Sequence, residues 1–213
     1  QALGKADYRE LVYIVLRNIF IAIFISFLII IFKPLLIHFL NQIFSTSTQT
    51  KVLIDNYISI RVFSAPAELT AYVLVGFYLG IQKTFVSSLL IIVSSVLNII
   101  LSIYFVKELN LNVTGVALGT LIAFYITIII FSVYTYFFIL KRFKVIPRFD
   151  SKIIFNYKKL FILFSINIDI FIRTILLTFS FFWISYLGST LGEEYIAINS
   201  ILIQLIFISS FFL

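Results

Sequence analysis

Residues 57–82 read YISIRVFSAPAELTAYVLVGFYLGIQ, and this stretch is long and apolar enough to cross a lipid bilayer as a helix. About 20 residues, each rising about 1.5 Å, span the hydrocarbon core. Arg61, Ser64 and Glu68 are three and four residues apart, so a helix carries them on one face. Pro66 lacks the backbone N–H that a carbonyl four residues earlier needs. We therefore expect the helix to bend or open about one turn from Glu68.

Arg61 and Glu68 are candidates for an ion-coupling or substrate pathway, because a charge near the middle of a bilayer is costly and marks function. One interpretation is that Glu68 binds and releases a proton, since loss of water favours its neutral form while Arg61 favours its charged form. The other is a permanent ion pair between the two residues that fixes the helix. The sequence leaves both interpretations open.

The composition of the 213 residues places the chain among membrane proteins. Hydrophobic residues make up 62%, charged residues only 12%, and the mean hydropathy is +1.15. The absence of cysteine excludes a disulfide framework and a thiolate metal site. The absence of methionine leads us to expect an internal fragment of a longer chain.

Enzymatic chemistry finds little support in the sequence. His38 is the only histidine, so it has no second imidazole or thiolate with which to hold a metal ion. It is also predicted to lie near the far surface, away from any serine it could activate. The acidic residues of the spans are not clustered as a metal-diphosphate enzyme requires. We expect neither an enzyme nor a cofactor, apart from a coupling ion.

The remaining apolar segments predict about six membrane spans in an all-helical protein. These spans are expected at residues 11–32, 57–82, 84–106, 115–140, 160–187 and from 195 onward. Residues 35–44 are too few to span again and are expected to continue past a bend at Lys33-Pro34. Arg17, close to the start of the first span, is expected to extend back to the near surface.

Basic residues set the expected orientation. The N-terminal segment, the 82–83 turn and the 141–159 loop carry ten of them, against three on the other side. Positive loops stay in the cytoplasm, so the N-terminus and the 141–159 loop are predicted to lie inside. Part of that loop has helical spacing of apolar residues and is expected to rest on the inner surface. Because its charge has this topological reason, we expect no nucleic-acid partner.

Polar residues also recur within the later spans. Ser87, Ser94, Asn98 and Ser102 form a stripe on one helix, which either bonds to a neighbouring helix or lines a wet cavity. The fifth span holds further candidates for the ion or substrate pathway, Asn167, Asp169 and Arg173. Asp169 and Arg173 are four residues apart and carry opposite charge, so a structural salt bridge is the first expectation.

Glycines four residues apart predict close contact between helices. Gly76 and Gly80 form one such pair in the second span, and Gly115 and Gly119 form another at the start of the fourth.

Several short motifs in this order resemble the DinF-like branch of the multidrug and toxic compound extrusion (MATE) family. They are Ile60-Arg61, Ser64-Ala65-Pro66-Ala67, Gly76-Phe77-x-x-Gly80-x-Gln82, Asn98-Ile-Ile-Leu-Ser102, Gly115-Val-Ala-Leu-Gly-Thr120 and Asn167-x-Asp169-Ile-Phe-Ile-Arg173-Thr174. Such transporters have twelve helices in two lobes of six. The resemblance implies that this chain holds the third to eighth of them. Residues 1–140 would then end the N-terminal lobe, 141–159 form the cytoplasmic linker, and 160–213 begin the C-terminal lobe.

The resemblance implies a monomeric secondary antiporter in a bacterial cytoplasmic (inner) membrane. It would export small organic, drug-like cations in exchange for H⁺ or Na⁺. One family feature, an acidic residue on the first helix, would precede residue 1. Another is altered, since many relatives have Asp where this chain has Ser102. This change weakens the hypothesis that Asn98 and Ser102 alone bind a cation and makes Glu68 the stronger candidate. The alternatives are a lipid or polysaccharide-precursor flippase of the same superfamily, and a non-transporting membrane assembly subunit.

Overall fold

The computed structural model describes residues 7–43, 48–146, 151–191, 198 and 201–205, and these contain helices and no strand. The elements in chain order are α1 (Tyr8–Ile31), α2 (Lys33–Ile43), α3 (Thr48–Arg61), the 3₁₀ segment η1 (Val62–Ser64), α4 (Ala65–Gly80), α5 (Thr84–Lys107), α6 (Asn112–Phe143), α7 (Ser151–Ile154) and α8 (Tyr157–Leu191). The chain divides into two compact units, residues 1–155 and 156–213. The division falls inside the predicted 141–159 linker and leaves most of it with the first unit.

Four segments are long and apolar enough to cross a membrane: α1, the combined α3–α4 segment, α5 and α6. They correspond to the first four predicted spans, which confirms an all-helical integral membrane fold. The second begins earlier than predicted, because α3 takes in Thr48–Asn56. The fifth predicted span lies in α8. The sixth, from residue 195, lies outside the described residues except for 198 and 201–205.

Local signals explain where the helices of the first unit begin and end. The Asp7 carboxylate caps α1 by accepting the backbone N–H of Glu10 at 2.9 Å. The helix is interrupted at Phe32, just before Lys33-Pro34, and α2 continues from there. Between α5 and α6 the chain turns through Asn110, which has a φ of 54°, a left-handed conformation that asparagine tolerates well.

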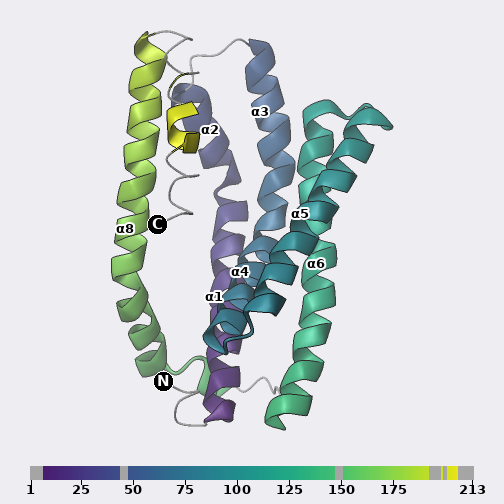
Figure 1. Ribbon diagram of the computed structural model, residues 1–213. Coiled ribbons are helices and arrows are strands. Elements are labelled where there is room, and N and C mark those ends of the chain that lie inside the picture. Colours follow the sequence, from purple (N-terminus) through teal and green to yellow (C-terminus); the bar gives the residue numbers. More distant parts are fainter. Residues whose placement is uncertain (1–6, 44–47, 147–150, 192–197, 199–200, 206–213) are drawn as a thin grey trace. The chain divides into compact units, whose positions relative to one another are not determined.

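The long helices of the first unit alternate in direction, so that α1, α3–α4, α5 and α6 form an antiparallel bundle (Figure 1). α1 packs against α4, α5 packs against α6, and both α3 and α4 contact α6. One apolar cluster joins the start of α1 to the ends of α4 and α6 through Leu11, Val12, Val15, Phe77, Tyr78 and Ile139. Van der Waals packing of these side chains helps to hold the three ends together, because lipid chains are as apolar as the cluster itself.

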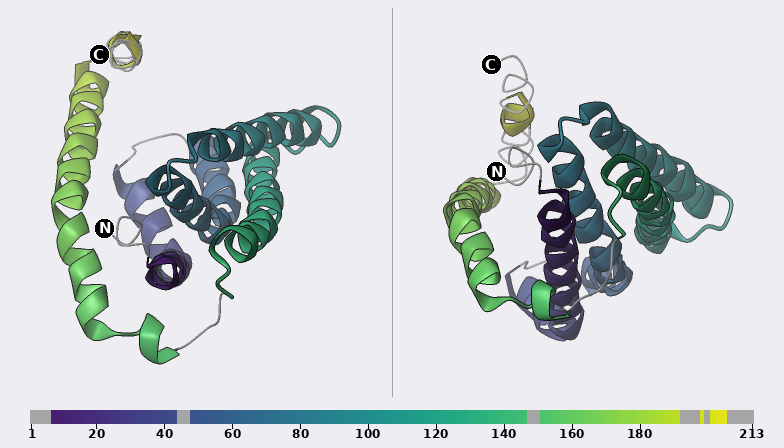
Figure 2. Two further views of the ribbon diagram at one scale, coloured as in Figure 1. Left: turned by 60° about the horizontal axis from the view of Figure 1, so that its bottom comes forward. Right: turned by 90° about the horizontal axis from the view of Figure 1, so that it is seen from below.

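The start of α1 and the end of α6 lie at one end of this bundle, which faces the viewer in the right panel of Figure 2. The rings of Tyr8, at the start of α1, and Phe143, at the end of α6, stack with centroids 4.8 Å apart. Ile81, in the turn after α4, packs on the same cluster. The start of α1, the turn after α4 and the end of α6 therefore lie near one another, and the side of the membrane on which they lie stays a prediction from the charge count.

We expect a cysteine at Lys141 to be labelled by a membrane-impermeant thiol reagent only after the cells are opened. A cysteine at Lys107 should be labelled in intact cells, because it lies at the opposite end of the bundle. The two variants are matched, since each replaces an exposed lysine in a stretch of 213 residues that has no cysteine. Labelling at Lys141 in intact cells would reverse the orientation.

Candidate functional site

The α-helix of the second span is interrupted by the 3₁₀ turn η1, and Pro66 is the second residue of α4 that follows; we call this interruption the break. Hydroxyl groups supply hydrogen bonds to carbonyls around this break. Ser64 donates to the Arg61 carbonyl at 2.7 Å, and Thr70 donates to the Pro66 carbonyl at 2.6 Å. Tyr125 reaches across from α6 and donates to the Phe63 carbonyl at 3.1 Å. These bonds matter because a bilayer offers no water to a carbonyl left without a partner.

Four side chains around the break form what we call the charge cluster: Arg61, Ser64, Glu68 and Tyr72. Arg61 Nη2 lies 2.7 Å from Glu68 Oε2, and the two side chains are 29% and 18% exposed. A second guanidinium nitrogen, Nη1, donates to Ser64 Oγ. The predicted shared face is therefore occupied, and the ion pair is formed in this conformation. A formed pair is the starting state for either interpretation of Glu68.

Tyr72 is a member of the cluster that the sequence did not single out. Its hydroxyl donates to Glu68 Oε1 at 3.1 Å, so the carboxylate has Arg61 on one oxygen and Tyr72 on the other. The signal that could have found it is its position four residues after Glu68 on the same helix face.

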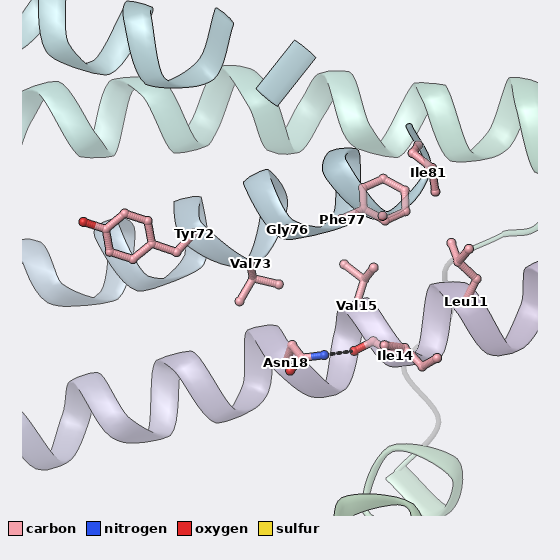
Figure 3. Close-up of a pocket in the computed structure, with 10 residues that line it drawn as sticks. Leu11, Ile14, Val15, Asn18, Tyr72, Val73, Gly76, Phe77 and Ile81 are labelled. Carbon is pink, nitrogen blue, oxygen red and sulfur yellow. Dashed lines mark hydrogen bonds between the residues drawn. The ribbon is translucent and has the colours of Figure 1, made fainter. Parts of the chain in front are cut away.

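Tyr72 also lines a pocket of about 510 Å³ between α1 and α4, shown in Figure 3. Most of the lining is apolar and aromatic, and Asn18 is the main polar side chain from α1. The full lining is Leu11, Ile14, Val15, Asn18, Tyr72, Val73, Gly76, Phe77, Gly80 and Ile81. The Asn18 side-chain amide is turned back to its own helix, where it donates to the Ile14 carbonyl at 2.8 Å. Tyr72 thus connects the pocket to the charge cluster.

The two glycine pairs have different surroundings. Gly76 and Gly80 line the pocket, and a Cβ at either would meet no atom within 4 Å. In the described part of the chain the pocket separates both glycines from α1, so neither is in close contact with another helix and their role in helix packing stays a prediction. Gly115 and Gly119 lie directly against α5. A Cβ on Gly119 would be 2.5 Å from Ser102 Oγ.

Asn98 and Ser102 lie in the interface between α5 and α6. Asn98 Nδ2 donates to Thr120 Oγ1 at 2.7 Å, and Ser102 lies under Gly119. Earlier in the same stripe, Ser87 donates to the Val75 carbonyl of α4 at 3.1 Å. Neither Asn98 nor Ser102 lines the described pockets or contacts the charge cluster. Of the two interpretations of the polar stripe, the described contacts favour bonding between helices.

The candidates in α8 belong to the second unit. The side chains of Asn167 and Asp169 lie outside the described residues, so the ion pair between Asp169 and Arg173 stays a prediction. Arg173 is exposed and lines a hollow of about 410 Å³ on α8 together with Ile172, Leu176, Leu177 and Ser180.

Two expectations about the cytoplasmic end need correction. Arg17 does not reach water, since its side chain is 1% exposed. The amphipathic helix expected in the basic loop is only four residues long, and Tyr157 already begins α8.

The described residues contain no group of three His, Cys, Asp or Glu side chains that could hold a metal ion. His38 is exposed, and its Nε2 lies 3.0 Å from the Gln42 side-chain nitrogen. The described helices thus form a spanning bundle that has a charge cluster at a proline break and an aromatic pocket beside it. Charges and a helix break inside a span define a class of helical membrane protein to which carriers belong.

Comparisons with known proteins agree with this class. Residues 1–104 match the family model described as MatE. The chain is 30% identical to DNA damage-inducible protein F of Escherichia coli (strain K12), with 97% of this chain and 44% of that protein covered. It is 27% identical to multidrug export protein MepA of Staphylococcus aureus (strain NCTC 8325 / PS 47), over 84% of this chain and 39% of that protein. No solved structure gives a significant match.

The chain is therefore a homologue of the MATE transporters, an integral protein of the cytoplasmic (inner) membrane. It spans less than half the length of the curated relatives it matches.

Proposed function

We propose that the chain is part of a secondary active antiporter that exports organic, drug-like cations in exchange for H⁺ or Na⁺. The observation that carries the proposal is the charge cluster at a helix break within a spanning segment. Carriers bind their coupling ions at discontinuous helices near the middle of the bilayer, and acidic side chains inside a span mark ion or proton pathways. The family relation and the export role in the printed name of MepA support the same conclusion.

The contacts suggest how Glu68 works. In the described conformation Arg61 Nη2 lies 2.7 Å from Glu68 Oε2, so the two side chains are placed as an ion pair. Binding of a proton to Glu68 removes the negative charge of this pair, so Arg61 keeps its hydrogen bond to Ser64 and its other guanidinium nitrogen turns to water. Because Pro66 has no backbone N–H to donate and η1 already departs from α-helical bonding, the α3 and α4 halves of the span can then change their angle with the loss of fewer hydrogen bonds than in an unbroken α-helix.

The pocket offers a place for the exported molecule next to this switch. Its wall of Tyr72, Phe77 and aliphatic side chains suits a flat, apolar cation. A cation at this wall lies near the Tyr72 hydroxyl, which bonds to Glu68. Substrate and coupling ion would then compete for one carboxylate, which is the simplest way to obtain exchange. We further propose that the protein acts as a monomer on a small molecule and catalyses no covalent chemistry.

The proposal predicts that Glu68→Gln in the full-length protein lowers export of a fluorescent organic cation by about tenfold or more, equivalent to about 1.4 kcal/mol. It should also remove the dependence of export on external pH, because the amide keeps the shape but cannot titrate. Transport would be followed as dye uptake into everted vesicles, which corresponds to export from the cell, at several pH values, with and without Na⁺. Asp55→Asn is the matched control, an acidic residue of the same span outside the cluster.

Wild-type efflux with unchanged pH dependence in Glu68→Gln would remove Glu68 as the coupling residue. If wild-type efflux responds to Na⁺ and not to pH, and Glu68→Gln abolishes this efflux, the coupling ion is Na⁺. Movement of lipid-linked substrates without dye efflux would favour the flippase alternative instead.

A further inference from the structure

Arg17 is an arginine inside the first span, and its side chain is 1% exposed. Its Nη1 lies 3.0 Å from Glu10 Oε1, one helical repeat of seven residues back toward the cytoplasmic end. Its Nε donates to the backbone carbonyl of Ile153 at 3.4 Å, a residue 136 positions later in the chain. The third nitrogen, Nη2, is buried and has no hydrogen-bond partner in the described structure.

The carbonyl that Arg17 binds belongs to α7, the short helix in the basic loop. The last carbonyls of a helix have no partner within the helix, and a cation placed there is favourable. Arg17 therefore acts as a side-chain cap for the C-terminal end of α7. The pairing with Glu10 offsets the charge, so the guanidinium is buried at a lower cost than an unpaired one.

Apolar contacts hold the same segment on α1. Ile154 is 1% exposed, as fully buried as the residues of the bundle core. The ring of Phe155 packs edge-on against Phe20 of α1, with centroids 4.5 Å apart. The first compact unit ends at Phe155, directly after these contacts.

We infer that Arg17 is a docking residue that fixes residues 153–155 of the basic loop to α1. Movement between the two units then starts after Phe155 rather than at the end of α6. The first unit thereby includes most of the 141–159 loop, which the sequence predicted to be a cytoplasmic linker between the two lobes. This inference does not depend on what the protein transports.

The test is cross-linking between Phe20→Cys and Phe155→Cys in an otherwise cysteine-free full-length protein in membranes. A protease site inserted in the loop after α5, near Leu109, lets the cross-link be scored, because linked fragments stay together after cleavage. With Arg17 present, a short reducible bifunctional thiol reagent should link most of the protein. In the Arg17→Gln background the rate of cross-linking between the two cysteines should fall about tenfold, equivalent to about 1.4 kcal/mol of docking energy.

Arg9→Gln is the matched control, because Arg9 is an exposed arginine of the same helix, and it should leave the rate unchanged. Arg17→Lys covers the case in which Arg17→Gln fails to fold. It keeps the charge opposite Glu10 but loses the planar group that binds two acceptors at once, so docking should weaken in a folded protein. Equal cross-linking rates in wild type and Arg17→Lys would overturn the inference. Since the assay measures no transport, its outcome is independent of the proposed antiport.

Discussion

Replacing Arg61 by methionine, or Glu68 by leucine, should destabilise the full-length protein more than making both replacements together. Each single variant leaves one charge without its partner in a spanning segment, which we expect to cost about 2–3 kcal/mol. The double variant removes both charges and should recover much of this loss. The measurement is a double-mutant cycle on unfolding in detergent, in which the non-additive part reports the coupling between the two residues.

Lys83→Met and Glu108→Leu provide the control for this cycle. Both residues are exposed and lie at opposite ends of α5, so their effects should be small and additive. Additive losses for Arg61 and Glu68 as well would show that the ion pair seen in the structure contributes nothing to stability.

Among Gly76, Gly80, Gly115 and Gly119, replacement by alanine should destabilise the protein most at Gly119. The new Cβ would lie 2.5 Å from Ser102 Oγ, 2.7 Å from Ser102 N and 2.9 Å from Ser102 Cα. Two of these atoms are backbone, so α5 and α6 must move apart, at an expected cost of about 1–3 kcal/mol beyond the gain in helix propensity. The thermal unfolding midpoint of the detergent-solubilised protein should therefore fall.

Gly76→Ala is the matched substitution, since Gly76 is also a helical glycine of a four-residue pair. Its Cβ would meet nothing within 4 Å, so only the gain in helix propensity of up to about 1 kcal/mol remains. A fall in the unfolding midpoint at Gly76 as large as at Gly119 would contradict this account, and would indicate that another helix covers this face in the full-length protein.

The face shared by Arg61, Ser64 and Glu68 was predictable, because helical spacing is a property of the local chain. The break beside Pro66 was predictable for the same reason. What the spacing cannot say is which other side chain completes the site. Tyr72 is one of twelve tyrosines in a chain rich in aromatic residues, and only the geometry distinguishes it from the others.

The two glycine pairs show the limit of a motif. Both have the same spacing, and spacing shows only that small residues share a face. Whether a helix covers that face depends on the topology, which places α5 over Gly119 and leaves Gly76 beside a pocket.

Arg17 shows a limit of a different kind. Its distance from the start of the first span made a surface position the expected outcome. Its burial depends on Ile153, which is 136 residues away, so no local pattern contains this contact. The seven-residue spacing between Glu10 and Arg17 was the available signal, and it indicates a shared face without indicating burial.

The hydrogen bond from Tyr125 to the Phe63 carbonyl has a consequence for the rate of any rearrangement at the break. It ties the 3₁₀ segment to α6, and Lys33 of α2 lies over the Phe63 ring at 5.7 Å from its centroid. A change in angle between α3 and α4 must therefore displace parts of two further helices. Motion of that kind is a collective rearrangement on the scale of microseconds to milliseconds, slower than the nanosecond flip of a single side chain.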